Sequence, residues 1–150
     1  MNSTGSIRRI HASDPALEKI KELDKHQFPQ PWSEESWKSM NWDFHHLYAW
    51  EIGGEIIGFC LFFHISGDDS AHLLKICIDS KSRGAGYSSG LWSKVRDQLQ
   101  LFGMKSIYLE VETKNDRAIG FYLKNQFKKL RTVKHFYSNG EDALTMILML

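Results

Sequence analysis

The chain has 150 residues, of which 42% are hydrophobic and 13% aromatic, and its 19 Lys and Arg against 18 Asp and Glu leave a formal net charge of +1. This length suits one domain over residues 1–150, with enough apolar residues for a proper core. Near-neutral charge argues against a general nucleic-acid-binding protein, since such domains usually carry a strong basic excess. The longest apolar run, Ile56–Phe63, is less than half of a membrane span.

The N-terminal residues and the cysteines indicate a cellular compartment. Residues 1–9 contain no apolar signal segment, which argues against secretion by that route. Cys60 and Cys77 lie in apolar stretches without CxxC spacing, as is typical of reduced core thiols. We therefore expect a cytoplasmic protein without a membrane partner, a direct nucleic-acid partner or a bound metal.

The first half of the chain predicts a strand, two helices and a hairpin. Asp14-Pro15 gives an N-cap followed by proline at the first helical position, and Ser33 gives a second N-cap. Gly53-Gly54 supplies the positive φ angles of a tight turn. The strand after this turn is apolar on both faces, which predicts a central position in a sheet. The expected elements are a strand over 7–12, helices over 14–27 and 33–40, and strands over 47–52 and 55–65.

The second half of the chain predicts alternating strands and helices. Asn115 caps the second of two helices. The alternation of residues 105–112 places Glu110 on the strand face opposite the apolar residues. Asn139-Gly140 is the expected turn of a last hairpin whose first strand is aromatic. The expected elements are strands over 72–79 and 105–112, helices over 86–102 and 115–125, and a final strand over 144–150.

This order of elements predicts a chain of the mixed α/β class. A central mixed sheet of about seven strands would carry about four helices, distributed over both of its faces. No internal repeat and no linker rich in Pro, Ser or Gly divides the sequence. The whole chain is therefore expected to form this one sheet.

A glycine loop, Arg83-Gly84-Ala85-Gly86-Tyr87-Ser88, lies between a predicted strand and a predicted helix. Glycines let backbone N–H groups approach a phosphate, and the dipole of the following helix favours the negative charge. Lys81 and Arg83 add cations at the same place. The pattern also fits an ordinary tight turn, and its spacing fits neither a Walker loop nor a dinucleotide-binding fingerprint.

A carboxylate and a phenol form a second chemical signal. Glu110 lies at the C-terminal end of its predicted strand, and Tyr122 lies two turns into the next helix. If they face one cleft, they form a base–acid pair. Each residue also has a purely structural interpretation: a solvated charge for Glu110, a core ring for Tyr122 and a simple helix cap for Asn115.

In this order the motifs resemble the GNAT superfamily of acetyl-CoA-dependent N-acetyltransferases. Residues 81–86 match its glycine motif, and Asn115, Ala118 and Tyr122 match its Asn-x-x-Ala-x-x-x-Tyr segment. The chain is most similar to the RimI-like branch, whose members acetylate protein N termini, typically of a small-subunit ribosomal protein. Residues 28–33, Leu109-Glu110-Val111 and the hairpin residues 140–146 carry that similarity.

The chain departs from the family pattern at several places. Lys81 stands where Gln or Arg is usual, Tyr87 where a basic residue is common, and Gln126 where a Gly precedes Phe127. The stretch between Asp79 and the glycine loop is also shorter than usual. Gln126 affects the conformation at the end of a helix, because glycine suits a left-handed C′ position. The other departures affect the binding of a pyrophosphate.

The resemblance implies a mostly antiparallel sheet, acetyl-CoA as co-substrate and a mechanism by direct attack. Glu110, with Glu112 as its rival, would take the proton of the amine directly or through water, and Tyr122 would protonate the leaving thiolate. Residues implied to bind the cofactor are Ile76, Cys77 and Ile78, then Ser82, Arg83, Gly84, Ala85, Gly86, Tyr87 and Ser88, and Asn115. Residues implied to frame the acceptor are Phe28, Trp32, Tyr137 and Glu141.

Three functions remain open from the sequence. The first is an N-terminal acetyltransferase of the ribosomal-protein-alanine type, acting on a peptide or a protein N terminus. The second is a GNAT enzyme for a small amine or a lysine side chain. The third is a non-catalytic CoA-binding or interaction domain. Glu110 and Tyr122 argue against the third, and residues 28–33 favour the first over the second.

Overall fold

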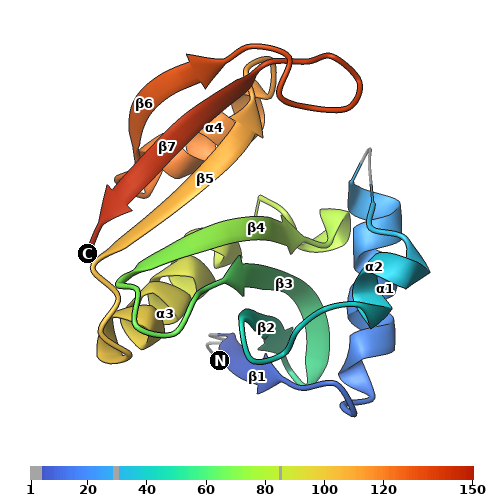
Figure 1. Cartoon of the computed structure of the whole chain (residues 1–150). Coiled ribbons are helices and arrows are strands. Elements are labelled where there is room, and N and C mark those ends of the chain that lie inside the picture. The colour runs from blue at the N-terminus through green and yellow to red at the C-terminus, as the bar shows by residue number, and fades with distance from the viewer. Residues whose placement is uncertain (1–4, 29–30, 85) are drawn as a thin grey trace.

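The computed structural model describes residues 5–28, 31–84 and 86–150, which form one seven-stranded sheet with helices packed against it (Figure 1). The predicted order of elements is confirmed, and outside the last hairpin each predicted end lies within two residues of the observed one. The strands are β1 (Ser6–Ile10), β2 (His45–Ile52), β3 (Glu55–Phe63), β4 (Ser70–Ile78), β5 (Ser106–Glu112), β6 (Lys128–Val133) and β7 (Ala143–Met149). The helices are α1 (Ala16–Gln27), α2 (Glu34–Lys38), α3 (Tyr87–Leu101) and α4 (Asp116–Lys124), and a 3-10 turn, η1 (Ser80–Ser82), precedes α3.

The sheet has the strand order β1-β2-β3-β4-β5-β7-β6. The β4–β5 pair is parallel and the remaining pairs are antiparallel, so the predicted mixed, mostly antiparallel sheet is confirmed. The apolar strand β3 lies between β2 and β4, as predicted. β4 and β5 pair only where Ser70–His72 faces Ser106–Tyr108, and beyond this point the two strands diverge (Figure 1).

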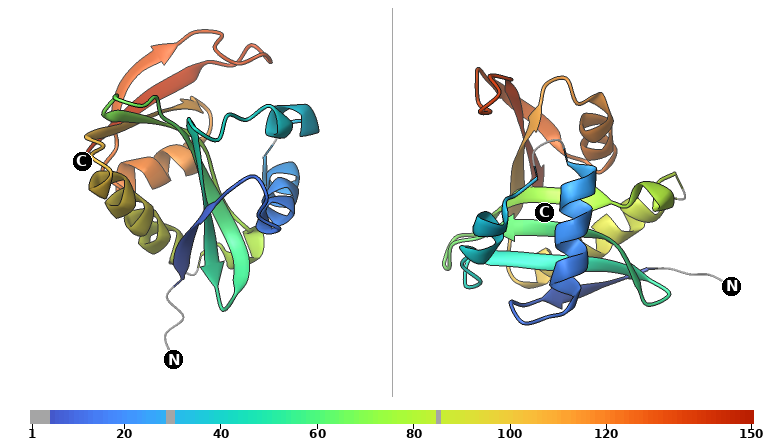
Figure 2. Two further views of the ribbon diagram at one scale, coloured as in Figure 1. Left: turned by 60° about the horizontal axis from the view of Figure 1, so that its bottom comes forward. Right: turned by 90° about the vertical axis from the view of Figure 1, so that its right-hand side faces the viewer.

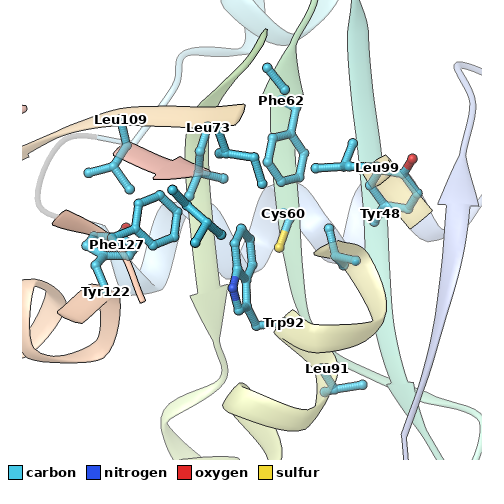
Figure 3. Close-up of a cluster of buried hydrophobic side chains, with 14 of the residues drawn as sticks. Tyr48, Cys60, Phe62, Leu73, Leu91, Trp92, Leu99, Leu109, Tyr122 and Phe127 are labelled. Carbon is cyan, nitrogen blue, oxygen red and sulfur yellow. The ribbon is translucent and has the colours of Figure 1, made fainter. Parts of the chain in front are cut away.

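Helices cover both faces of the sheet, as the sequence predicted. α1 and α2 lie on one face, and α3 and α4 lie on the other (Figure 2). The core under α3 is aromatic: the ring of Trp92 stacks on Phe62, with centroids 6.2 Å apart, and lies 5.7 Å from the ring of Phe127 (Figure 3). One apolar core therefore lies under α3 and α4 and extends from β2 to β7, and a second lies under α1 and α2 against β1–β4.

Most local capping and turn signals form as the sequence predicts, but α1 begins at Ala16 with Pro15 as its N-cap, and Asp14 Oδ1 accepts the N–H of Ala16 at 2.9 Å. Ser33 Oγ and Asn115 Oδ1 each accept the backbone N–H of the residue three positions later, at 3.1 Å. Gly53 and Gly54 have φ angles of 60° and 81°, and they join β2 to β3. These contacts depend on neighbours in the chain, which explains why the sequence alone locates them.

The last hairpin differs from the prediction, which placed Asn139-Gly140 between two directly paired strands. The connection between β6 and β7 spans residues 134–142, and within it the Gly140 N–H donates to the Tyr137 carbonyl at 2.9 Å. The carboxylate of Asp142 accepts the backbone N–H of His135 at 2.9 Å, so a side chain replaces a ladder partner. The aromatic residues of this segment therefore lie in a connection and not in a strand.

Gln126 holds a backbone conformation that glycine usually takes. Its φ is 75°, directly behind α4, and such a conformation costs a non-glycine residue roughly 1 kcal/mol. We expect Gln126→Gly to raise the free energy of unfolding in urea by roughly 0.5–1 kcal/mol, since part of the gain is lost to the entropy of the unfolded chain. The reciprocal change Gly103→Gln is the control. Gly103 follows α3 with a φ of 87°, so this change should lower the free energy of unfolding. Equal stability of all three proteins would contradict the argument.

Candidate active site

A cavity of about 970 Å³ opens where β4 and β5 diverge. β5 pairs with β4 only as far as His72, so the backbone of β4 beyond it turns unpaired N–H and C=O groups toward the cavity. Most of the residues that the sequence singled out line it: Phe28, Trp32, Ile76, Cys77, Ile78, Ser82, Arg83, Gly84, Tyr87, Ser88, Glu110, Asn115, Tyr122 and Tyr137. The structure therefore brings together residues that are far apart in the sequence.

A few predicted site residues do not line this cavity. Gly86 is the N-cap of α3, with a φ of 80°, and serves the turn into that helix. The carboxylate of Glu141 is bound by Lys114 Nζ at 3.2 Å, because the connection between β6 and β7 directs it to that cation. Glu141 is not among the residues that line the cavity, and its role toward the acceptor stays a prediction. Ala85 lies outside the described residues, as do the two residues between Phe28 and the next described range.

The glycine loop has a different arrangement of charge from the one predicted. Arg83 Nε donates to the carbonyl of Ile78 at 3.1 Å, and its Nη2 donates to Gln27 Oε1 at 2.6 Å. These two bonds tie the loop to β4 and α1, and they hold the guanidinium through neutral acceptors that do not compensate its charge. The cationic side chains that line the cavity are Arg83 itself, Lys75, Lys114 and Arg117.

Glu110 is held by a histidine that the sequence analysis did not single out. Its Oε1 lies 2.6 Å from His72 Nε2, and the two side chains are 19% and 22% exposed. The imidazole ring of His72 stacks on Tyr108, with centroids 4.3 Å apart and an interplanar angle of 13°. Only the β4–β5 register, which sets His72 opposite Tyr108, brings this pair together. One carboxylate oxygen of Glu110 is thus engaged, and the other remains for a ligand.

Two phenols line the cavity with their protons retained. Burial raises the pKa of Tyr122 above its ordinary value, and the ring packs between Phe121 and Phe127. Burial, and then the charge of Glu110, raise the pKa of Tyr137 to about 12. Both hydroxyl groups are therefore protonated at neutral pH and are able to donate a hydrogen bond or a proton.

A buried ion pair fixes the wall formed by residues 28 and 32. Lys75 Nζ lies 2.7 Å from Asp24 Oδ1, and the other oxygen of Asp24 accepts the backbone N–H of Trp32 at 2.8 Å. The same ammonium lies 4.4 Å from the ring centroid of Phe28 and 5.5 Å from that of Trp32. In the sequence, Lys75 is a lysine within an otherwise mostly apolar strand. This pattern indicates a buried cation that needs a partner.

The thiol of Cys77 keeps its proton. Burial, and then the charge of Asp24, raise the pKa of Cys77 to about 12, so the thiol is a weak nucleophile at neutral pH. Within residues 5–28, 31–84 and 86–150, no group of three or more His, Cys, Asp or Glu is arranged to hold a metal ion. None of the helices in these same ranges is long and apolar enough to cross a membrane.

The family follows from a comparison of sequences. The sequence profile of the acetyltransferase (GNAT) family matches residues 17–127, and the chain belongs to this family. Its curated relatives include N-acetyltransferases.

Particular relatives share the fold and much of the sequence length. The ribosomal protein bS18-alanine N-acetyltransferase of Escherichia coli strain K12 is 26% identical over 151 aligned positions, which cover 99% of this chain and 97% of that protein. The crystal structure of the Escherichia coli enzyme matches with a TM-score of 0.80 over 97% of this chain and 93% of that one. The N-alpha-acetyltransferase of Sulfurisphaera tokodaii is 26% identical over 107 residues, 64% of this chain and 64% of that relative's length.

A solved structure of an enzyme named for a different substrate also matches. A spermidine N-acetyltransferase chimera from Vibrio cholerae has a TM-score of 0.82 at 22% identity, over 98% of this chain and 96% of that chain. Likeness at this level of identity shows the fold alone, so fold similarity does not choose between a protein acceptor and a small amine.

Proposed function

We propose that the protein transfers an acetyl group from acetyl-CoA to the α-amine of a protein or peptide N terminus in the cytoplasm. The observation that carries this proposal is that a carboxylate, Glu110, and a protonated phenol, Tyr122, line one cavity where β4 and β5 diverge. The relation to the Escherichia coli alanine N-acetyltransferase, over nearly the whole chain, supports a protein N terminus as acceptor. A ribosomal protein that begins with alanine is one acceptor of this class.

The cavity offers acetyl-CoA two kinds of contact. The unpaired edge of β4 at Ile76–Ile78 suits the amides of the pantetheine arm, which would extend the sheet in place of β5. The pyrophosphate would lie on backbone N–H groups of the loop from Ser82 to Ser88, at the start of α3, where the helix dipole favours negative charge. Lys114 and Arg117 line the same cavity and add positive charge.

The side chains divide the proton transfers of acetyl transfer between them. Glu110 accepts a proton from the acceptor amine, directly or through one water, as its nitrogen forms a bond to the thioester carbon. Tyr122 donates its proton to the sulfur as the carbon–sulfur bond breaks, and the proton that Glu110 took from the amine returns to the phenolate through solvent, which restores both side chains. His72 holds Oε1 of Glu110 and leaves Oε2 to face the amine. No covalent intermediate on the protein is required, in keeping with the protonated thiol of Cys77.

The aromatic wall formed by Phe28 and Trp32 favours a neutral amine over a polyamine as the acceptor. Aromatic faces bind organic cations, but the faces of Phe28 and Trp32 are already near the ammonium of Lys75. Lys75 is paired with Asp24, but its ammonium already lies against these two rings and leaves them less available to a second cation. An α-amine has a pKa near ~8 against ~10.4 for a lysine side chain, so it reaches the neutral, nucleophilic form more readily.

The position of the pyrophosphate is tested at Gly84. This residue has a φ of 81° and lines the cavity, so a valine there would strain the loop and add bulk where the phosphate approaches. We expect Gly84→Val to weaken CoA binding by roughly 10–100-fold in calorimetry. Gly54→Val, at the same φ of 81° in the β2–β3 turn, is the matched control and should leave the affinity unchanged. Equal affinities of both variants would place the pyrophosphate elsewhere.

The nature of the acceptor is tested by three substrates. We expect the highest kcat/KM for a peptide that begins with a free alanine, by at least about tenfold. The comparison substrates are the same peptide with a blocked N terminus and an internal lysine, and spermidine. Mass spectrometry after incubation with acetyl-CoA locates the acetyl group. Equal or greater activity on lysine or spermidine would favour the small-amine or lysine alternative, and CoA binding without acetylation of any of them would favour a non-catalytic domain.

A further inference from the structure

A second, smaller cavity lies between the edge strand β1, strand β2 and the C-terminal half of α3. Its volume is about 200 Å³, and it is lined by Ile7, Arg9, Tyr48, Gln98 and Phe102. None of these five residues lines the larger cavity. The lining combines a guanidinium, a phenol and an amide with two apolar side chains, and it contains no carboxylate. The guanidinium and the other donors of this lining favour the binding of an anion.

Two polar groups of this cavity lack hydrogen-bond partners. Tyr48 is 3% exposed, at the β1 side of the core cluster (Figure 3), and its hydroxyl makes no hydrogen bond of good geometry among the described residues, although the guanidinium of Arg9 lies near it. The Nε of Arg9 is also buried and has no partner within the same part of the chain. A buried donor without an acceptor costs free energy, and such groups are normally satisfied. A ligand that carries acceptor oxygens would supply both missing bonds.

Arg9 differs in its surroundings from Arg8, which faces the opposite side of β1. Arg8 forms ion pairs with two carboxylates, whereas Arg9 takes part in none of the ion pairs found in the described ranges. Cζ of Arg9 instead lies 5.7 Å from the ring centroid of Tyr48, its partner across the strands. Burial, and then the charge of Arg9, lower the pKa of His46 to about 4, so this nearby imidazole is neutral at pH 7. Arg9 therefore contributes a positive charge that no carboxylate of the described ranges pairs with.

We propose that this second cavity binds a carboxylate carried on a small apolar body. The planar fork of Arg9 suits both carboxylate oxygens, and the hydroxyl of Tyr48 donates to the same group. Ile7 and Phe102 contact the apolar part. The volume lies below the ~300–1,000 Å³ of sites for drug-sized molecules, which restricts the ligand to a small one. A free organic acid and a peptide C terminus that ends in an apolar residue offer this same chemistry.

Two probes distinguish these sources in nuclear magnetic resonance titrations of the full, labelled chain without acetyl-CoA. One is benzoate, and the other is an N-acetylated pentapeptide that ends in leucine with a free carboxylate. The signals to follow are the Arg9 Nε–H and the Gln98 side-chain amide. We expect saturable shifts with a Kd of about 1 mM or tighter from one acid at least. Benzamide and the C-terminally amidated peptide, which lack the charge, should cause none.

Substitutions on β1 and β2 locate the binding. Tyr48→Phe should weaken the binding by about tenfold and Arg9→Gln by more, whereas Arg8→Gln should change it by less than about twofold. Tyr48→Phe should not lower the Tm, because the hydroxyl that it removes makes no hydrogen bond in the free protein. The proposal is overturned if neither acid gives saturable shifts at about 20 mM, if Tyr48→Phe binds as tightly as the wild type, or if the shifts centre on the glycine loop. Acetyl transfer is not measured, so these outcomes leave the proposed function untouched.

Discussion

Replacing Tyr122 by phenylalanine is expected to lower kcat by roughly 10²–10⁴-fold with little change in CoA affinity. The ring packs between Phe121 and Phe127 and would stay in place without its hydroxyl. Burial raises the pKa of this phenol, so the hydroxyl is protonated at neutral pH, as the proposed role of proton donor requires. Steady-state kinetics, together with calorimetry of CoA binding, separates the loss of chemistry from a loss of binding.

Two other tyrosines provide the comparison for this prediction. Tyr48→Phe removes a buried hydroxyl outside the larger cavity and should leave kcat unchanged. Tyr137 is the rival donor, because it lines the same cavity and its pKa is raised to about 12. A large loss of kcat in Tyr137→Phe with near-normal turnover in Tyr122→Phe would assign the acid role to Tyr137.

The elements of this fold follow from signals that neighbouring residues carry. A glycine pair at 53–54 turns β2 into β3, and Asn115 caps α4 through a contact three residues away. The apolar run of β3 predicted its central position because both of its faces are buried. Gln126 shows the limit of such signals: its backbone is left-handed although glycine is absent, because the end of α4 imposes that conformation.

The parts of the site that the sequence did not reveal depend on contacts between distant residues. His72 and Glu110 are 38 positions apart, and Lys75 and Asp24 are 51 positions apart. No spacing rule links either pair, because each arises from the packing of one element against another. A sequence can show that a buried lysine needs a partner, but only the packing of α1 on β4 identifies it as Asp24.

Long charged side chains near the cavity were the least predictable. Arg83 was expected to face a phosphate, yet it donates to Ile78 and Gln27. Glu141 was expected to face the acceptor, yet it binds Lys114. Such side chains have several rotatable bonds and reach any of several partners within a few ångströms. The chain position of the residue fixes its Cα but not the partner of its charge.

The second large loss of kcat is expected when Glu110, the proposed general base, is replaced. Glu110→Gln should lower kcat by roughly 10²–10⁴-fold and remove the acidic limb of the pH–rate profile, because glutamine keeps the shape of the side chain but cannot accept the amine's proton. CoA affinity should hold. Glu112 also lines the cavity, so Glu112→Gln is the matched control and should retain most of the activity. Near-normal turnover of Glu110→Gln with a loss in Glu112→Gln would reverse the two roles.

The contact between His72 and Glu110 predicts how a third variant combines with this one. If His72 acts by holding Oε1 of Glu110, then His72→Asn should lower kcat by less than Glu110→Gln does. The double variant should be no slower than Glu110→Gln alone, because a positioning residue has no effect once the group that it positions is gone. Losses that multiply in the double variant would show that His72 contacts the reacting groups independently. A non-additive result would instead make the register of β4 against β5, which sets His72 beside Glu110, part of the catalytic design of this chain.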